Sequence, residues 1–144
     1  MGPMVDVSIS PRGEARLRQG HPWIYRSDVA ETTAAGGEVV RVVGARHRVL
    51  GSAFFSDRSQ ITLRMLTHDE RAVDRAFWRG RLEAAVRFRE TLGIEASAYR
   101  LVHGEADLLP SLVVDRYGDV LVLQTLSQGT DRRLTEFAEL LVEI

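Results

Sequence analysis

The chain has 144 residues, a formal net charge of −1, 44% hydrophobic and 27% charged residues, and no cysteine. This length suits one ordinary domain or two small ones, and the composition is typical of a globular chain. The composition excludes disulfides, thiolate metal sites and a cysteine nucleophile, and no apolar run is long enough for a membrane span or has the pattern of a signal peptide.

The first part of the chain, to about residue 70, has the pattern of mostly β structure. Short apolar runs bounded by polar or small residues predict strands at 5–9, 23–25, 38–43, 49–55 and 60–66. The last of these is the clearest, because Ile61, Leu63 and Met65 alternate with polar residues. With one short helix, these strands favour a small β-barrel.

That short helix is predicted over residues 12–19. Ser10 is a suitable N-cap, Pro11 fits the first turn, and Gly20 is a stop signal. A second, longer helix is predicted over residues 72–92, with Gly93 as its C-cap.

The region after the long helix predicts three strands and a last helix. An apolar run that ends before Asp115 is followed by a turn at Gly118, which suits a two-residue hairpin, and by a second apolar run. Thr130 is the expected N-cap of the last helix. Its apolar stripe continues to Ile144 without a stop signal, so we expect the second part, residues 71–144, to be an incomplete α+β domain.

Basic and aromatic residues gather in the first part of the chain. Four arginines and one acid lie between Arg12 and Arg26, and a second basic run precedes residue 49. Arginines neutralise phosphates and aromatic rings stack on exposed bases. The alternative is a solvated charged face, with Trp23 in the core. The candidate RNA-binding residues are Arg12, Arg16, Arg18, His21, Trp23, Arg26, Arg46 and Arg48.

Acidic residues mark the second part. Glu105, Asp107 and Asp115 stand at ends of apolar strands, where carboxylates accept hydrogen bonds from loop amides. His103, Glu105 and Asp107 alternate and so also suggest a metal site. Gly104 interrupts the strand there, however, and favours a structural role. Asp115 and Arg116 are interpreted as a hairpin ion pair. We therefore predict structural roles for Glu105, Asp107, Asp115 and Arg116, and no catalytic or metal-binding residue.

Two segments carry a resemblance to a known family. H-P-W-I-Y-R-S-D-V at 21–29 and Y-R-L-V-H-G-E-A-D-L-L-P-S-L-V-V-D-R-Y-G-D at 99–119 resemble the class I ribosomal RNA large-subunit methyltransferases, which methylate cytosine at C5. In that family a PUA domain precedes a small central α+β domain and a Rossmann-like catalytic domain. The resemblance implies a PUA-like RNA-binding domain at 1–70, a central domain at 71–144, and a catalytic domain absent from this chain.

The resemblance also implies a cytoplasmic protein that binds ribosomal RNA and does not associate with a membrane. The parent enzyme would use S-adenosylmethionine, but this chain has neither the glycine-rich strand-to-helix turn of such a site nor the family's catalytic cysteine. We therefore expect no cofactor and no methyl transfer by this chain alone. A homodimer is compatible with the sequence.

Two other function classes fit the residues. One is a standalone RNA-binding or adaptor protein, which a short open reading frame would support. The other is a small enzyme that uses carboxylates such as Glu105, Asp107 and Asp115, which a deep pocket lined by these acids would support.

Overall fold

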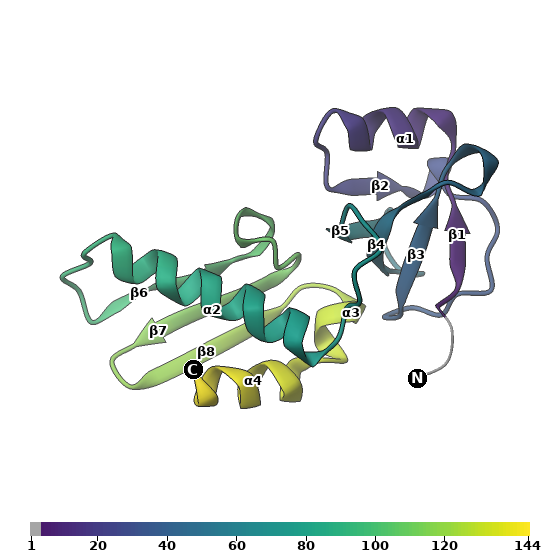
Figure 1. Cartoon of the computed structure of the whole chain (residues 1–144). Coiled ribbons are helices and arrows are strands. Elements are labelled where there is room, and N and C mark those ends of the chain that lie inside the picture. Colours follow the sequence, from purple (N-terminus) through teal and green to yellow (C-terminus); the bar gives the residue numbers. More distant parts are fainter. Residues whose placement is uncertain (1–3) are drawn as a thin grey trace. The chain divides into compact units, whose positions relative to one another are not determined.

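The computed structural model describes residues 4–144, which form two compact units, one ending at Ala72 and the other beginning at Val73 (Figure 1). The first unit contains β1 (Asp6–Ser8), α1 (Pro11–Arg18), β2 (Trp23–Tyr25), η1 (Arg26–Asp28), β3 (Val39–Val43), η2 (Ala45–His47), β4 (Val49–Phe55) and β5 (Ile61–Thr67). These bounds confirm the five predicted strands and the first predicted helix to within two residues.

The five strands form one curled sheet in the order β1-β3-β4-β5-β2. The pair β1–β3 is parallel, and the other neighbours are antiparallel. An isolated bridge between Ile9 and Val29 joins the segments that follow the two edge strands. The sheet is thus drawn towards closure as a half-barrel, and the predicted α+β class with a small β-barrel is confirmed.

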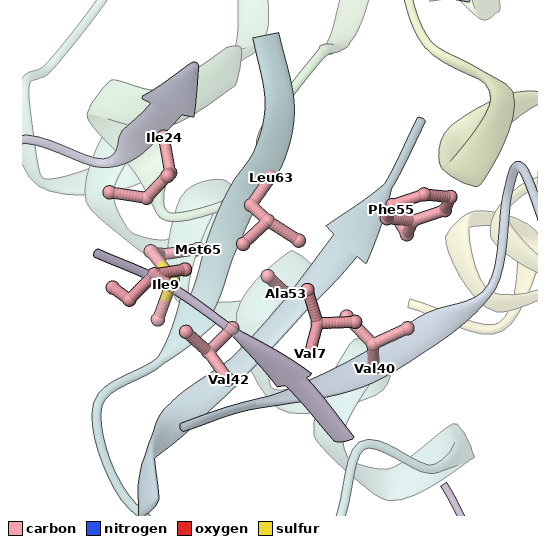
Figure 2. Close-up of a cluster of buried hydrophobic side chains, with 9 residues drawn as sticks. All are labelled: Val7, Ile9, Ile24, Val40, Val42, Ala53, Phe55, Leu63 and Met65. Carbon is pink, nitrogen blue, oxygen red and sulfur yellow. The ribbon is translucent and has the colours of Figure 1, made fainter. Parts of the chain in front are cut away.

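A cluster of apolar side chains fills the inside of this curled sheet (Figure 2). Its buried members are Val7, Ile9, Ile24, Val40, Val42, Ala53, Phe55, Leu63 and Met65. Leu63 and Met65 are two of the three residues whose alternation predicted β5. Val40 and Val42 show the same period of two on β3, because alternate side chains of a strand share one face.

Single residues determine where α1 starts and how closely β4 approaches β5. The Ser10 side chain accepts a hydrogen bond from the backbone N–H of Gly13, which confirms the predicted N-cap. On β4, Gly51 has φ +145°, and a Cβ there would lie 2.0 Å from the carbonyl oxygen of Thr67. Only glycine fits at this crossing of β4 and β5.

The second unit contains α2 (Arg75–Thr91), β6 (Ala98–His103), η3 (Gly104–Asp107), β7 (Leu112–Tyr117), β8 (Val120–Thr125), α3 (Gln128–Asp131) and α4 (Leu134–Glu143). Its three strands form an antiparallel sheet in the order β6-β7-β8. Tyr117 pairs with Val120, so the hairpin loop has two residues, and Gly118 takes φ +60° as the sequence predicted.

Two helices pack on this sheet, α2 against β6 and α4 against β8 (Figure 1). They meet through Trp78 and Phe137, whose rings lie edge to face with centroids 5.2 Å apart. Leu82 is fully buried in the same layer. Phe88, in contrast, is 53% exposed, so this aromatic side chain lies outside the buried face of α2.

The start of the last helix differs from the prediction. Ser127 caps the short helix α3, and Thr130 lies inside α3, buried and within hydrogen-bonding distance of the Ser127 and Ser111 hydroxyls. Helix α4 begins only at Leu134. Thr130 is therefore not the N-cap, because the cluster of hydroxyls at Ser111 draws its side chain inward.

Candidate nucleic-acid interface

Two buried carboxylates organise the basic residues of the first unit. Asp28, at the end of η1, is 3% exposed, and Glu14, on α1, is 6% exposed. A buried carboxylate requires compensating charge and hydrogen bonds. Arginines from two separate segments, α1 and the β3–β4 turn, provide this compensation.

Asp28 lies under the first turns of α1. It accepts hydrogen bonds from Ser10 Oγ and Arg12 Nε, each at 2.8 Å, and Arg16 Nε lies 4.0 Å from its other oxygen. Burial alone would raise the pKa of Asp28, but the Ser10 and Arg12 hydrogen bonds and the charges of Arg12 and Arg16 outweigh it and lower the pKa. Asp28 therefore stays ionised. It accepts a hydrogen bond from Arg12 and attracts the charge of Arg16, whose buried Nε makes no hydrogen bond with the described residues.

Glu14, on α1, is the second buried carboxylate that pairs with arginines. Arg18, four residues further along the helix, has a guanidinium nitrogen 3.6 Å from Glu14 Oε1. Arg48, which follows the η2 turn, donates a hydrogen bond to the same oxygen. This contact attaches the β3–β4 turn to α1 and brings together two basic segments that are 34 positions apart in the sequence.

The anchored arginines remain open to solvent. The side chains of Arg12, Arg18 and Arg48 are 66%, 65% and 58% exposed. A guanidinium has five N–H donors, so one or two bonds to a carboxylate leave donors directed outward. The result is a set of oriented, exposed cationic groups. We call Arg12, Arg16, Arg18 and Arg48 the anchored arginines.

An exposed aromatic ring adjoins the anchored arginines. The Arg16 guanidinium lies over the Tyr25 ring, 5.4 Å from its centroid, and Tyr25 is partly exposed. Trp23, the ring that the sequence favoured, is half-buried on β2 facing Arg64 of β5. Tyr25 is therefore the better placed of the two rings to stack on a base. Its position two residues after Trp23 on the same strand was the available signal.

The other predicted residues lie apart from this arrangement. Arg26 donates to the carbonyl oxygen of Ser59, 3.4 Å away, and is exposed. His21 is exposed in the turn between α1 and β2. Arg46 is exposed in the η2 turn, where it and His47 both have positive φ angles, a backbone conformation uncommon for residues with a Cβ.

In the second unit, two of the acids do bond loop amides. Glu105 accepts from the N–H of Ser111 at 3.0 Å, and Asp107 accepts from the N–H of His103 at 2.7 Å. Asp107 also receives two parallel hydrogen bonds from Arg89 on α2, at 2.6 and 2.7 Å. These contacts fix the loop between β6 and β7.

The expected Asp115–Arg116 ion pair does not form. Asp115 lies within β7 and pairs with Arg100 directly across the sheet on β6, with 2.8 Å between Oδ1 and Nε. Arg116 donates instead to the carbonyl oxygen of Gly118 and to the Tyr99 hydroxyl. Successive residues of a strand point to opposite faces, so neighbours such as these two rarely pair. Among residues 4–144, no three His, Asp or Glu side chains come close enough together to hold a metal ion.

Comparison with known proteins assigns the first unit. The model of the PUA-like domain family matches residues 7–68, which include both buried carboxylates and all the anchored arginines. Residues 7–68 therefore resemble the PUA-like domain family, and we refer to this segment as the PUA-like domain. Within residues 4–144, no helix is both long and apolar enough to cross a membrane.

The PUA-like domain and the second unit together resemble larger proteins. The chain is 41% identical over 132 residues to the ribosomal RNA large subunit methyltransferase I of Shewanella amazonensis, covering 88% of this chain and 33% of that protein. It is 35% identical over 147 residues to the ribosomal RNA large subunit methyltransferase of Deinococcus radiodurans, covering 96% of this chain and 36% of that protein. These relatives confirm the resemblance to ribosomal RNA large-subunit methyltransferases. The chain spans about a third of their length.

Solved structures show the same fold. A proposed methyltransferase complexed with SAH matches 97% of this chain and 37% of its own, with a TM-score of 0.86 at 15% identity. A proposed SAM-dependent methyltransferase from Streptococcus mutans matches with a TM-score of 0.85, also at 15% identity.

Proposed function

We propose that the PUA-like domain docks ribosomal RNA for an S-adenosylmethionine-dependent methyltransferase that modifies cytosine at C5 in the cytoplasm. The observation that carries the proposal is the set of anchored arginines beside Tyr25, in a chain similar to ribosomal RNA methyltransferases. Guanidinium groups held in place bind phosphate oxygens with little loss of rotamer freedom. Tyr25 supplies a stacking surface for a base.

The methyl-transfer chemistry belongs outside this chain. The sheet of the second unit is antiparallel, whereas cofactors of this kind bind at the carboxyl ends of parallel strands followed by helices. The chain also has no cysteine to attack the base. The described residues therefore do not fit the methyl donor, and we assign them the docking step alone.

The carboxylates of the second unit do not support a separate enzyme. Glu105 accepts a hydrogen bond from a loop amide, and Asp107 accepts from an amide and from Arg89. Asp115 accepts from Arg100. The pKa values of Asp107 and Asp115 are lowered, the reverse of what a general acid needs.

The salt dependence of RNA binding tests the docking proposal. If the four anchored arginines neutralise about four phosphates, the logarithm of affinity for single-stranded RNA falls with the logarithm of salt at a slope of about −3. Fluorescence anisotropy with a labelled RNA, between about 50 and 200 mM salt, measures this slope. The double variant Arg12→Gln, Arg18→Gln should flatten the slope by about 1.4 and weaken binding to all sequences.

A matched control lies on α2. Arg87 is exposed and Arg79 half-buried; both pair with Glu83, and Arg79 also pairs with Glu143 of α4. The double variant Arg79→Gln, Arg87→Gln removes the same charge from the second unit. Its slope should equal that of the parent, with circular dichroism confirming that both variants fold. Equal losses in the two double variants would mean diffuse attraction, and no binding by the parent at low salt would refute docking by this domain.

A further inference from the structure

A shallow pocket opens on the PUA-like domain. Its lining contains none of the anchored arginines. The pocket has a volume of about 270 Å³, and its lining includes Arg26, Val29, Glu31, Phe55, Asp57 and Thr62. These residues come from η1, the segment after it, the end of β4, the turn between β4 and β5, and the second position of β5. Arg26 is the only predicted RNA-binding residue in this lining.

One group in this lining is unexplained by the fold. Thr62 is 5% exposed, and its Oγ1 is buried without a hydrogen-bond partner among the described residues. Its neighbour Leu63 points into the apolar core, so Thr62 points to the opposite face of β5, towards the pocket lining. A buried hydroxyl without a partner is unfavourable, and valine would fill the same volume without that cost. The hydroxyl therefore indicates a ligand that bonds to it.

The remaining lining restricts the chemistry of that ligand. Val29 is half-buried and offers apolar surface that suits the face of a flat ring, whereas Phe55 is 6% exposed and belongs mainly to the core. Glu31 and Asp57 carry acceptor oxygens, which favour a ligand with N–H donors and disfavour a free phosphate. Arg26, which also lines the pocket, supplies a positive charge for the phosphate group of a nucleotide whose base occupies the pocket.

We propose that this pocket takes one unpaired nucleobase bearing an exocyclic amino group, namely adenine, cytosine or guanine. The proposal rests on the proposed RNA docking and adds to it a base-reading site. Thr62 bonds the edge of the base, and Glu31 accepts from the amino group, the pairing that carboxylates make with cytosine N4. Single-stranded RNA is commonly recognised in this way, with a splayed base bonded along its edge.

The test is a titration of the full chain with nucleoside 5′-monophosphates, followed by amide shifts in ¹⁵N NMR spectra. With CMP, AMP or GMP, the amides of Ala30, Glu31 and Asp57 should shift and saturate. UMP, which lacks the amino group, should bind at least about fivefold more weakly. Ribose 5-phosphate, which lacks the base, should leave these amides unmoved.

Two variants localise the effect. Thr62→Val should weaken CMP binding by about fivefold to tenfold, whereas Thr62→Ser, which keeps the hydroxyl, should bind as the parent does. Glu31→Gln should reduce the preference for CMP over UMP. Absence of shifts, equal binding of UMP, or equal shifts with ribose 5-phosphate would overturn the base site. None of these outcomes affects the salt slope set by Arg12 and Arg18, so failure here and failure of RNA docking are distinguishable.

Discussion

Two arginine–aspartate pairs in the second unit differ chiefly in their burial. The side chains of Arg89 and Asp107 are 10% and 9% exposed, and those of Arg100 and Asp115 are 45% and 20% exposed. An exposed pair gains little because water screens it, whereas the loss of one partner of a buried pair leaves a charge without compensation. The same chemistry therefore has different consequences at the two sites.

We expect Arg89→Gln to lower the free energy of unfolding by about 2–3 kcal/mol, because Asp107 then keeps only the His103 amide as a partner. Arg100→Gln, the matched control, should lower the free energy of unfolding much less, because water screens the exposed pair with Asp115. Urea unfolding followed by circular dichroism measures both. Equal midpoints for the two variants would contradict this assignment.

The pH dependence gives a second readout of the same pair. Burial raises the pKa of Asp107, but the hydrogen bonds from Arg89 and His103 outweigh it and lower the pKa below 3.8. A carboxylate with a lowered pKa stabilises the fold above its unfolded pKa and loses that contribution as the pH falls through its folded pKa. The difference between the parent and Arg89→Gln should therefore be full at neutral pH and shrink below about pH 3.8.

At the scale of elements, the β6–β7 loop contains a residue with an unfavourable backbone conformation, Leu108. Leu108 has φ +59° and is 61% exposed, while its carbonyl oxygen accepts from Arg81 and its N–H donates to Glu105. A left-handed conformation is unfavourable for a residue with a Cβ, and exposure means that the leucine side chain gains little from packing. The surrounding hydrogen bonds hold it there.

Leu108→Gly should therefore stabilise the chain by about 0.5–1 kcal/mol, because relief of the backbone strain exceeds the added freedom of the unfolded chain. Leu108→Ala keeps the strain and removes the exposed side chain, so its stability should match that of the parent. Thermal unfolding of the three proteins makes the comparison. A glycine variant no more stable than the alanine variant would show that the loop is unstrained.

Periodicity and local caps predicted most elements, because each depends on neighbours in the sequence. The alternation of Ile61, Leu63 and Met65 located β5, and Ser10 with Pro11 located the start of α1. The N-cap of the final helix was wrong because Thr130 is held by Ser111, 19 positions earlier. A cap chosen from local sequence cannot anticipate such a contact.

At the scale of the whole molecule, the segment from His68 to Ala72 is exposed throughout and separates the two compact units. Exposed segments with few contacts are the preferred sites of limited proteolysis. Digestion by a glutamate-specific protease should therefore cut first after Glu70 and leave two fragments that retain their circular dichroism. Glu70→Gln is the control and should delay this cut. An earlier cut within either unit, or loss of structure by the fragments, would show that the units depend on each other.

The candidate interface was predicted only in part. A local count of charges found the arginines between Arg12 and Arg26, because that signal is contained in a short window. The same count overlooked Asp28, just beyond the window, and could not reveal that Glu14 is buried. The joining of Arg48 to α1 depends on the path of the β3–β4 turn, which no spacing in the sequence encodes. The pocket at Thr62 likewise requires the folded sheet.

The buried carboxylates also bear on the kinetics of association. The whole chain has a net charge of −1, but residues 7–68 hold nine arginines and five acidic residues, a formal charge of +4. Glu14 and Asp28 cancel two of these nine positive charges, and salt screens the remainder over the Debye length of about 8 Å at physiological salt. The domain therefore attracts a polyanion at low salt, and its association with RNA should slow towards the unsteered rate of about 10⁵–10⁷ M⁻¹s⁻¹ as salt is added. Discrimination among RNA sites then resides in how long each complex lasts after contact.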